Sequence, residues 1–261
     1  MLVEPGQTNY DLRFRLFGTP VRVHPLFWLF SVIFGWNLMK GLHPFICMGI
    51  WVGCCFGSIL LHEFGHVWMG KLFGARDSYI VLYSFGGLAV GSNDLWHRWQ
   101  RIAVSLAGPG IQIALFGALW LGLKLLPEEQ RDSFPWWADF ALLNLLWINV
   151  AWAVFNLVPV WPLDGGMVSR EICTWLSPRG GLRFSLGLSV AVGEFFALHA
   201  LLANAKGAFV IPYLPTDTYV AILFGVLAVE SWQLLQMTPK PKGYEADDRM
   251  PWETDPDAWK R

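Results

Sequence analysis

The chain has 261 residues, of which 54% are hydrophobic and only 15% are charged. Soluble proteins carry about 25% charged residues, so this composition excludes an ordinary soluble enzyme and predicts a membrane protein. The formal net charge is −1, and the basic residues do not gather in one patch. We therefore expect no nucleic-acid partner.

Six apolar segments follow one another along the chain. A helix needs about 20 apolar residues to cross a hydrocarbon core of about 30 Å, and the first segment is shorter than this. We expect an all-α, polytopic membrane protein with about six transmembrane helices, embedded in the lipid bilayer of the cell membrane. The predicted spans are residues 26–39, 44–73, 102–123, 140–160, 184–203 and 219–237.

Lys and Arg are distributed unequally between the two sides of these spans. Fifteen of them fall in the N-terminal segment, in the connections after the second and fourth spans and in the tail, whereas four fall on the opposite side. Because Lys and Arg accumulate in cytoplasmic loops, both termini are expected in the cytoplasm. We predict one integral membrane domain over residues 1–237, with its core at 44–177, and a disordered cytoplasmic tail over 238–261.

A metal-binding pattern, His62-Glu63-Phe64-Gly65-His66, lies near the end of the second predicted span. Positions i and i+4 of an α-helix share one face, so both histidines can offer a ring nitrogen to one Zn²⁺. Glu63 is the neighbouring residue, where it could take a proton from a water whose pKa zinc has lowered to about 7. The pattern is typical of metal-assisted peptide hydrolysis.

Two short apolar runs separated by glycines follow the second span. Residues 79–83 and 88–90 flank Gly86 and Gly87, which predicts a short β-hairpin associated with the membrane. An unpaired edge at Gly86, Gly87 and Leu88 could bind an extended substrate peptide by β-augmentation. The alternative is a plain loop hairpin lying on the membrane.

A catalytic zinc site takes three protein ligands, so a third must come from elsewhere in the chain. The fourth span ends in a stretch that contains Asn156, two prolines, two glycines and the carboxylate of Asp164. By the predicted topology, the second and fourth spans both run inward, so Asp164 reaches the same depth as His62. Asp164 is therefore the candidate third ligand, although a turn or capping role is the alternative.

These motifs together resemble those of the site-2 protease family of intramembrane zinc metalloproteases. The family pattern combines HExxH on one membrane helix with an Asn-x-x-Pro-x-x-Pro-Leu-Asp-Gly stretch, found here at residues 156–165. Residues 16–25, 85–89 and 107–110 also resemble family segments. The resemblance implies that His62, His66 and Asp164 bind one zinc ion, that Glu63 is the general base, and that Asn156 steadies the substrate or an oxyanion. It also implies regulated intramembrane proteolysis of a transmembrane protein substrate.

The chain has no room for the PDZ or CBS domains found in some members of that family. Two other classes of function stay open, namely a metal transporter that uses the same ligands and a catalytically silent zinc-binding membrane protein. Glu63 argues against a transporter, because metal transit needs no base beside the ligands. The sequence does not assign the oligomeric state or the roles of four ionisable residues, His24, Glu194, His199 and Glu230.

Overall fold

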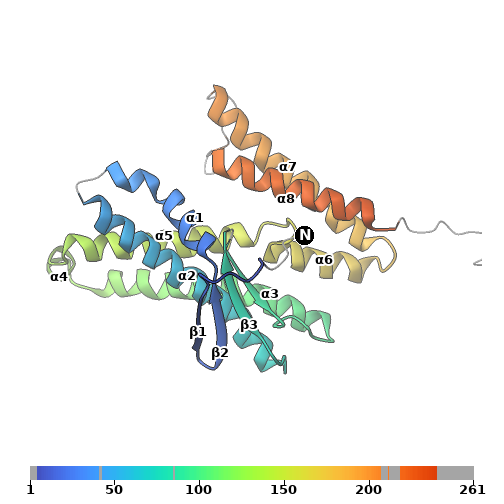
Figure 1. Cartoon of the computed structure of the whole chain (residues 1–261), viewed down its shortest axis with the longest axis horizontal. Coiled ribbons are helices and arrows are strands. Elements are labelled where there is room, and N and C mark those ends of the chain that lie inside the picture. Colours follow the sequence, from blue (N-terminus) through green and yellow to red (C-terminus); the bar gives the residue numbers. More distant parts are fainter. Residues whose placement is uncertain (1–4, 41–42, 85, 207–210, 212–217, 240–261) are drawn as a thin grey trace, which may run out of the picture. The chain divides into compact units, whose positions relative to one another are not determined.

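Helices make up most of this computed structural model, which describes residues 5–40, 43–84, 86–206, 211 and 218–239 (Figure 1). Five helices in the described residues are long and apolar enough to cross a membrane. These spans confirm a mostly helical, multi-pass membrane protein. They are α2 (Pro44–Leu72), α3 (Arg98–Leu125), α5 (Trp136–Asn156), α7 (Gly181–Lys206) and α8 (Thr218–Met237).

The first predicted span is instead a short helix followed by a 3-10 turn, α1 (Pro25–Phe34) and η1 (Trp36–Lys40). Ten residues of α-helix extend about 15 Å, which is half of the hydrocarbon thickness. His24 is the N-cap of α1, and its Nδ1 accepts a hydrogen bond from the Leu26 N–H at 3.2 Å. His24 therefore has a structural role at the start of this helix.

The predicted hairpin is present as part of a larger sheet. Strands β3 (Tyr79–Tyr83) and β4 (Gly86–Val90) are antiparallel, as expected, and β4 lies at one edge. An N-terminal hairpin, β1 (Leu12–Leu16) and β2 (Thr19–Val23), extends the sheet in the order β1-β2-β3-β4. Strands β2 and β3 pair in parallel. The sequence prediction did not include this N-terminal hairpin.

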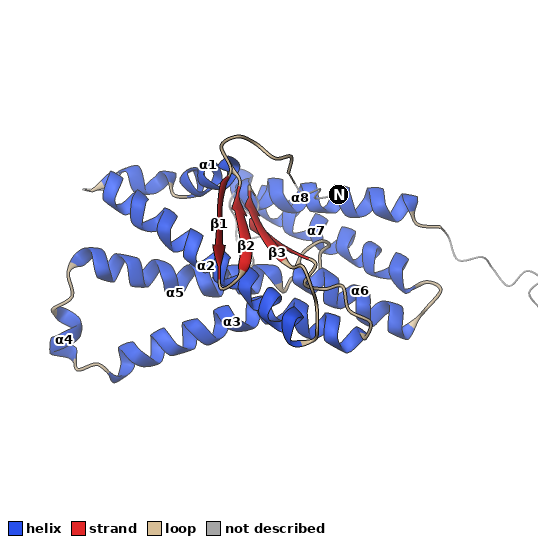
Figure 2. Ribbon diagram, turned by 60° about the horizontal axis from the view of Figure 1, so that its bottom comes forward, coloured by secondary structure: helices blue, strands red, loops and turns tan. Residues whose placement is uncertain are grey.

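The sheet packs on the half of α2 that carries the histidines (Figure 2). Alternate residues of β2 and β3 face the helix, because side chains in a strand point to opposite faces in turn. They form a buried cluster with α1 and α2, so the metal-binding end of α2 is held against a rigid layer. The cluster consists of Val21, Val23, Phe27, Ile59, Leu60, Phe64, Val67, Ile80 and Leu82.

Helix α2 also packs against α3 and α5, which lie side by side and are joined through the short α4 (Glu128–Asp132). The close contact with α3 is at Gly65, where an added Cβ would lie 2.6 Å from the Ala107 carbonyl oxygen. The sequence suggested a helix contact along Gly49, Gly53 and Gly57 as well. That suggestion is wrong, since a Cβ at any of these three positions would meet no atom within 4 Å.

The chain divides into two compact units, Met1–Glu171 and Ile172–Arg261. In the second unit α7 packs along α8, and the Arg183 guanidinium donates to the Leu235 carbonyl at 2.9 Å. The division neither supports nor opposes the predicted membrane domain over residues 1–237, which stays a prediction. The predicted tail begins at 238, and residues 240–261 lie outside the described residues.

Candidate metal centre

Two imidazoles meet on the buried face of α2. His62 and His66 are 2% and 7% exposed, and their Nε2 atoms lie 3.1 Å apart. This is the arrangement expected for residues one helical turn apart. The sequence-predicted pair is therefore brought together.

The third predicted ligand begins the next helix after α5, the 13-residue α6 (Asp164–Leu176). Asp164 Oδ2 lies 3.2 Å from His62 Nε2, and Oδ1 lies 3.4 Å from His66 Nε2. The following residue, Gly165, packs against the Leu157 carbonyl so closely that a Cβ would overlap it. Glycine is thus required for the chain to fold back from α5 and aim Asp164 at the histidines.

The three donor atoms fit a zinc ion. Zinc binds imidazole nitrogen and carboxylate oxygen at about 2.0–2.2 Å, so two ligands in a tetrahedral site lie about 3.3–3.4 Å apart. The two Nε2 atoms lie 3.1 Å apart, and each lies 3.2 or 3.4 Å from a different oxygen of Asp164. One donor atom from each of the three residues can be chosen so that all lie within 4.8 Å of one another. Two histidines and one carboxylate also match the donor set of hydrolytic zinc sites, which leave a fourth position open.

Buried acceptors set the orientation of both imidazoles. Gln112 of α3 is fully buried; its Nε2 donates to the Ser58 carbonyl at 3.2 Å, and its Oε1 lies 2.9 Å from His62 Nδ1. His66 Nδ1 lies 2.7 Å from the Val104 carbonyl oxygen. Because both partners are acceptors, each Nδ1 carries the proton and each Nε2 keeps a lone pair for metal. This tautomer follows from the hydrogen-bond network.

Asp164 is held in place through its helix. Seven residues further along α6, the Glu171 carboxylate accepts two hydrogen bonds from the Arg101 guanidinium of α3, both at 2.8 Å. Such a bidentate pair has a fixed geometry, so it anchors α6 to α3.

Glu63 shares a cavity of about 330 Å³ with the metal ligands. Its carboxylate is 4% exposed and accepts a hydrogen bond from the Ala89 N–H of β4. Gly87 of β4 is so close to Glu63 that a Cβ would overlap the glutamate side chain. The edge strand therefore forms one wall of the cavity, beside the proposed base.

The remaining sequence-predicted residues are at different distances from this cavity. Asn156 lines it, and its amide donates to the Trp152 carbonyl at 2.9 Å. Leu88 also lines it, whereas Gly86 packs against the Trp152 ring. The unassigned His199 belongs to the other unit, where its Nε2 accepts from the Ile211 N–H at 3.0 Å.

Two residues of α3 that contact the histidines were missing from the sequence-based site. Gln112 could have been found, because an amide inside an apolar span is costly unless it has a partner. Gly108 could have been assigned to the site only with coordinates. An added Cβ there would overlap His66 Nε2 and lie 2.9 Å from His62 Cε1. From the sequence, residues 107–110 were noted as a segment that resembles the family.

Comparison with known proteins agrees with this geometry. Residues 129–200 match peptidase family M50. The chain is 32% identical over 230 residues to a zinc metalloprotease of Synechocystis, covering 85% of this chain and 56% of that protein. It is 30% identical over 196 residues to a zinc metalloprotease of Methanocaldococcus jannaschii, covering 74% and 54%. A solved site-2 protease from the same archaeon shares the fold, with a TM-score of 0.56, 23% identity and coverage of 90% and 100%. The chain is thus similar to peptidase family M50 and to zinc metalloproteases, and it shares the fold of a site-2 protease.

These two relatives are named as zinc metalloproteases, and the cluster of His62, His66 and Asp164 fits the predicted zinc cofactor. The chain spans about half the length of the curated relatives it matches. The roles of single residues stay predictions.

Replacing Gln112 with Met is expected to weaken zinc binding by about 10–100-fold, the usual cost of losing a partner that orients a ligand histidine. Methionine is of similar size but cannot accept the Nδ1 proton of His62. A competition titration with a zinc chelator measures the change. Gln112→Glu keeps an acceptor and should restore most of the affinity, and equal weakening in both variants would contradict the orienting role.

Proposed function

We propose that this protein is an intramembrane zinc metalloprotease that hydrolyses a peptide bond in or near the transmembrane helix of a membrane protein. The observation that carries the proposal is the buried set of His62, His66 and Asp164, with Glu63 in the same cavity. Structural zinc sites are closed by four protein ligands, whereas this one has three and adjoins a cavity.

The proposed chemistry assigns each side chain a role. Zinc bound by the three ligands would lower the pKa of water and polarise the scissile carbonyl. Glu63 accepts the proton of the attacking water and then passes it to the leaving amine. The Ala89 N–H holds one side of its carboxylate in place during this transfer. Asn156 lines the same cavity, where its amide can orient the substrate or an oxyanion.

Two other functions use the same ligands. A metal transporter must release its ion, which is less compatible with imidazoles held rigidly by Gln112 and Val104. A catalytically silent zinc protein would not need Glu63 in the cavity. The direct test incubates the purified chain with single-pass membrane proteins from the same genome. Cleavage that stops with a zinc chelator and returns with added zinc supports the protease, and its absence for every protein tested opposes it.

The β4 edge is the proposed binding site for the substrate backbone. A transmembrane helix satisfies its backbone hydrogen bonds internally, so it must open before its carbonyls can be attacked. Gly87 and Leu88 line the cavity that contains Glu63, and β4 is an edge strand of the described sheet. An extended substrate segment added to this edge would lie next to the proposed base.

Substrates should therefore carry Gly, Pro or Asn near the scissile bond. Helix propensity is lower than that of Ala by about 1 kcal/mol for Gly and about 3 kcal/mol for Pro. Replacing such residues with Leu is expected to slow cleavage by about fivefold for one Gly and about 100-fold for one Pro. Gel-based initial rates on a substrate series measure this. Unchanged rates across the series would show that helix opening does not limit cleavage.

The unequal distribution of Lys and Arg supports an orientation with both termini in the cytoplasm. This orientation requires α1 and η1 together to cross the membrane in addition to the five long helices. Single cysteines introduced near Arg98 and Arg179 should then react from the cytoplasmic side, and one near Glu129 from the opposite side. Labelling of Arg98 and Arg179 from opposite sides would contradict this orientation.

A further inference from the structure

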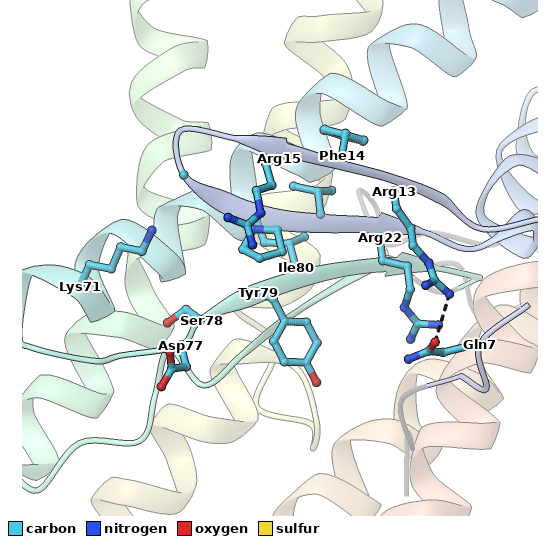
Figure 3. Close-up of a pocket in the computed structure, with 13 residues that line it drawn as sticks. Gln7, Arg13, Phe14, Arg15, Arg22, Lys71, Asp77, Ser78, Tyr79 and Ile80 are labelled. Atoms are coloured by element: carbon cyan, nitrogen blue, oxygen red, sulfur yellow. Dashed lines mark hydrogen bonds between the residues drawn. The ribbon is translucent and has the colours of Figure 1, made fainter.

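A second, larger cavity lies away from the metal centre, beside the β1–β2 hairpin. It has a volume of about 910 Å³ and is lined by β1, β2, β3 and the end of α2 (Figure 3). Arg13 and Arg22 are directly opposite each other in the β1–β2 register, and Arg15 follows two positions along β1. Three guanidinium groups therefore come from the same face of this hairpin.

The positive charges that line this cavity, called the basic groove below, are only partly compensated. The Asp11 carboxylate forms ion pairs with Arg22 at 3.1 Å and with Arg13 at 3.6 Å, and Arg13 also donates to Gln7 at 3.1 Å. Lys71 Nζ donates to the neutral Thr19 hydroxyl at 2.7 Å. Among the residues that the structure describes, no carboxylate lies within ion-pair distance of Arg15 or Lys71. Asp77 is the single acidic residue in the lining, so the groove has an excess of positive charge.

Aromatic side chains beside the groove indicate its depth in the membrane. Phe17, at the β1–β2 turn, is 71% exposed, and its ring lies 5.9 Å from that of Trp68, which is 40% exposed. Trp68 and Lys71 are three residues apart near the end of the apolar helix α2, so they share one face. Aromatic residues at the end of a span lie at the level of the lipid headgroups. The basic groove is therefore at the level of the phosphates.

We propose that this groove binds the phosphate of an anionic phospholipid headgroup between Arg15 and Lys71, while Phe17 and Trp68 lie in the interfacial layer. Arginine and lysine are the usual phosphate-binding side chains. Lys71 follows His66 by five residues on α2, which is about 7–8 Å along the helix axis. A lipid held in the groove thus fixes how far the metal centre lies below the phosphates. This inference rests on the membrane location of the chain and not on its proteolytic activity.

Lipid-dependent thermal unfolding of the full chain in mixed micelles tests the proposal. A ligand that binds the folded state raises the unfolding midpoint, and the rise with lipid fraction gives an apparent affinity. Phosphatidylglycerol is expected to raise the midpoint more than phosphatidylcholine does, and the difference should shrink in high salt. The double variant Arg15→Gln/Lys71→Gln should bind phosphatidylglycerol about 30-fold more weakly, which is the scale for two cations near anionic lipid.

Two matched variants serve as controls. Lys124→Gln/Arg131→Gln removes the same charge outside the groove and should change the affinity by less than about twofold. Arg15→Lys/Lys71→Arg keeps both charges and should retain the lipid effect, which separates binding from any folding defect of the glutamine pair. Equal effects of the two lipids, or equal losses in the groove and control pairs, would overturn the proposal.

Two further arms identify the source of the phosphate. Inorganic phosphate in lipid-free detergent should give little stabilisation, because it lacks the acyl chains that accompany Phe17 and Trp68 into the interface. Stabilisation by inorganic phosphate equal to that by phosphatidylglycerol would assign the groove to a free anion. If a poly-glutamate peptide abolishes the stabilisation by phosphatidylglycerol at a concentration below that of the lipid, the groove would be assigned to an acidic protein segment. Either result would overturn the lipid assignment.

Discussion

Replacing Glu63 with Gln is expected to lower the cleavage rate by about 10²–10⁴-fold, the usual contribution of a general base. The glutamine amide has nearly the same shape, and its oxygen can still accept the hydrogen bond from the Ala89 N–H. It cannot accept the proton of the attacking water. Initial rates on a substrate identified with the wild-type protein measure the loss.

The interpretation of that loss depends on the metal content and the fold of the variant. Glu63 is not among the three proposed ligands, so Glu63→Gln should bind as much zinc as the wild type and unfold at a similar temperature. A variant that keeps near-normal turnover would remove Glu63 from the proposed mechanism. Absence of cleavage by the wild type, in contrast, would favour the transporter or the silent zinc-binding protein.

Replacing Gly108 with Ala is expected to remove most of the bound zinc, although Gly108 is not one of the three proposed ligands. The new Cβ would overlap His66 Nε2, one of the donor atoms, and lie 2.9 Å from His62 Cε1. Helices α2 and α3 are in contact here through Gly65 and Ala107, so the imidazoles cannot move aside without separating the helices. Overpacking of this kind typically costs about 1–3 kcal/mol.

Gly110 provides a matched control on the same helix, because a Cβ at that position would meet no atom within 4 Å. Gly110→Ala should keep its zinc and fold at least as stably as the wild type, since Ala is the better helix former. Metal analysis of the two purified variants gives the comparison. Full zinc content in Gly108→Ala would show that α3 does not confine the imidazoles.

The parts of the site that could be predicted from sequence depend on local spacing. The pairing of His62 and His66 follows from the helical repeat, and the apolar runs predict the helices that carry them. Asp164 is 98 residues beyond His66, and only the matched direction of two spans suggested that they meet. The distances between their donor atoms show that this reasoning placed the carboxylate correctly.

The parts that were missed depend on tertiary contacts. The β1–β2 hairpin has a clear alternation of Leu12, Phe14 and Leu16 with Arg13 and Arg15, but it was interpreted as a lead into the first helix. A strand of five residues becomes recognisable only with its partners in the sheet.

Helix contacts were equally difficult to assign. The glycine ridge of α2 suggested a contact along Gly49, Gly53, Gly57 and Gly65, whereas of these four positions α3 approaches closely at Gly65 alone. Spacing shows which residues share a helix face, but it does not show which face a neighbouring helix covers. The partnership of Gln112 with His62 could not be predicted for the same reason.

Zinc analysis of ligand variants tests the central claim most directly, namely that His62, His66 and Asp164 together hold one zinc ion. The wild type is expected to contain about one zinc per chain after purification, and so is His97→Ala, which removes an exposed histidine in front of α3. His62→Ala and Asp164→Ala should each lose most of the metal, because two remaining ligands bind zinc weakly. Full retention of zinc in both variants would contradict this ligand set.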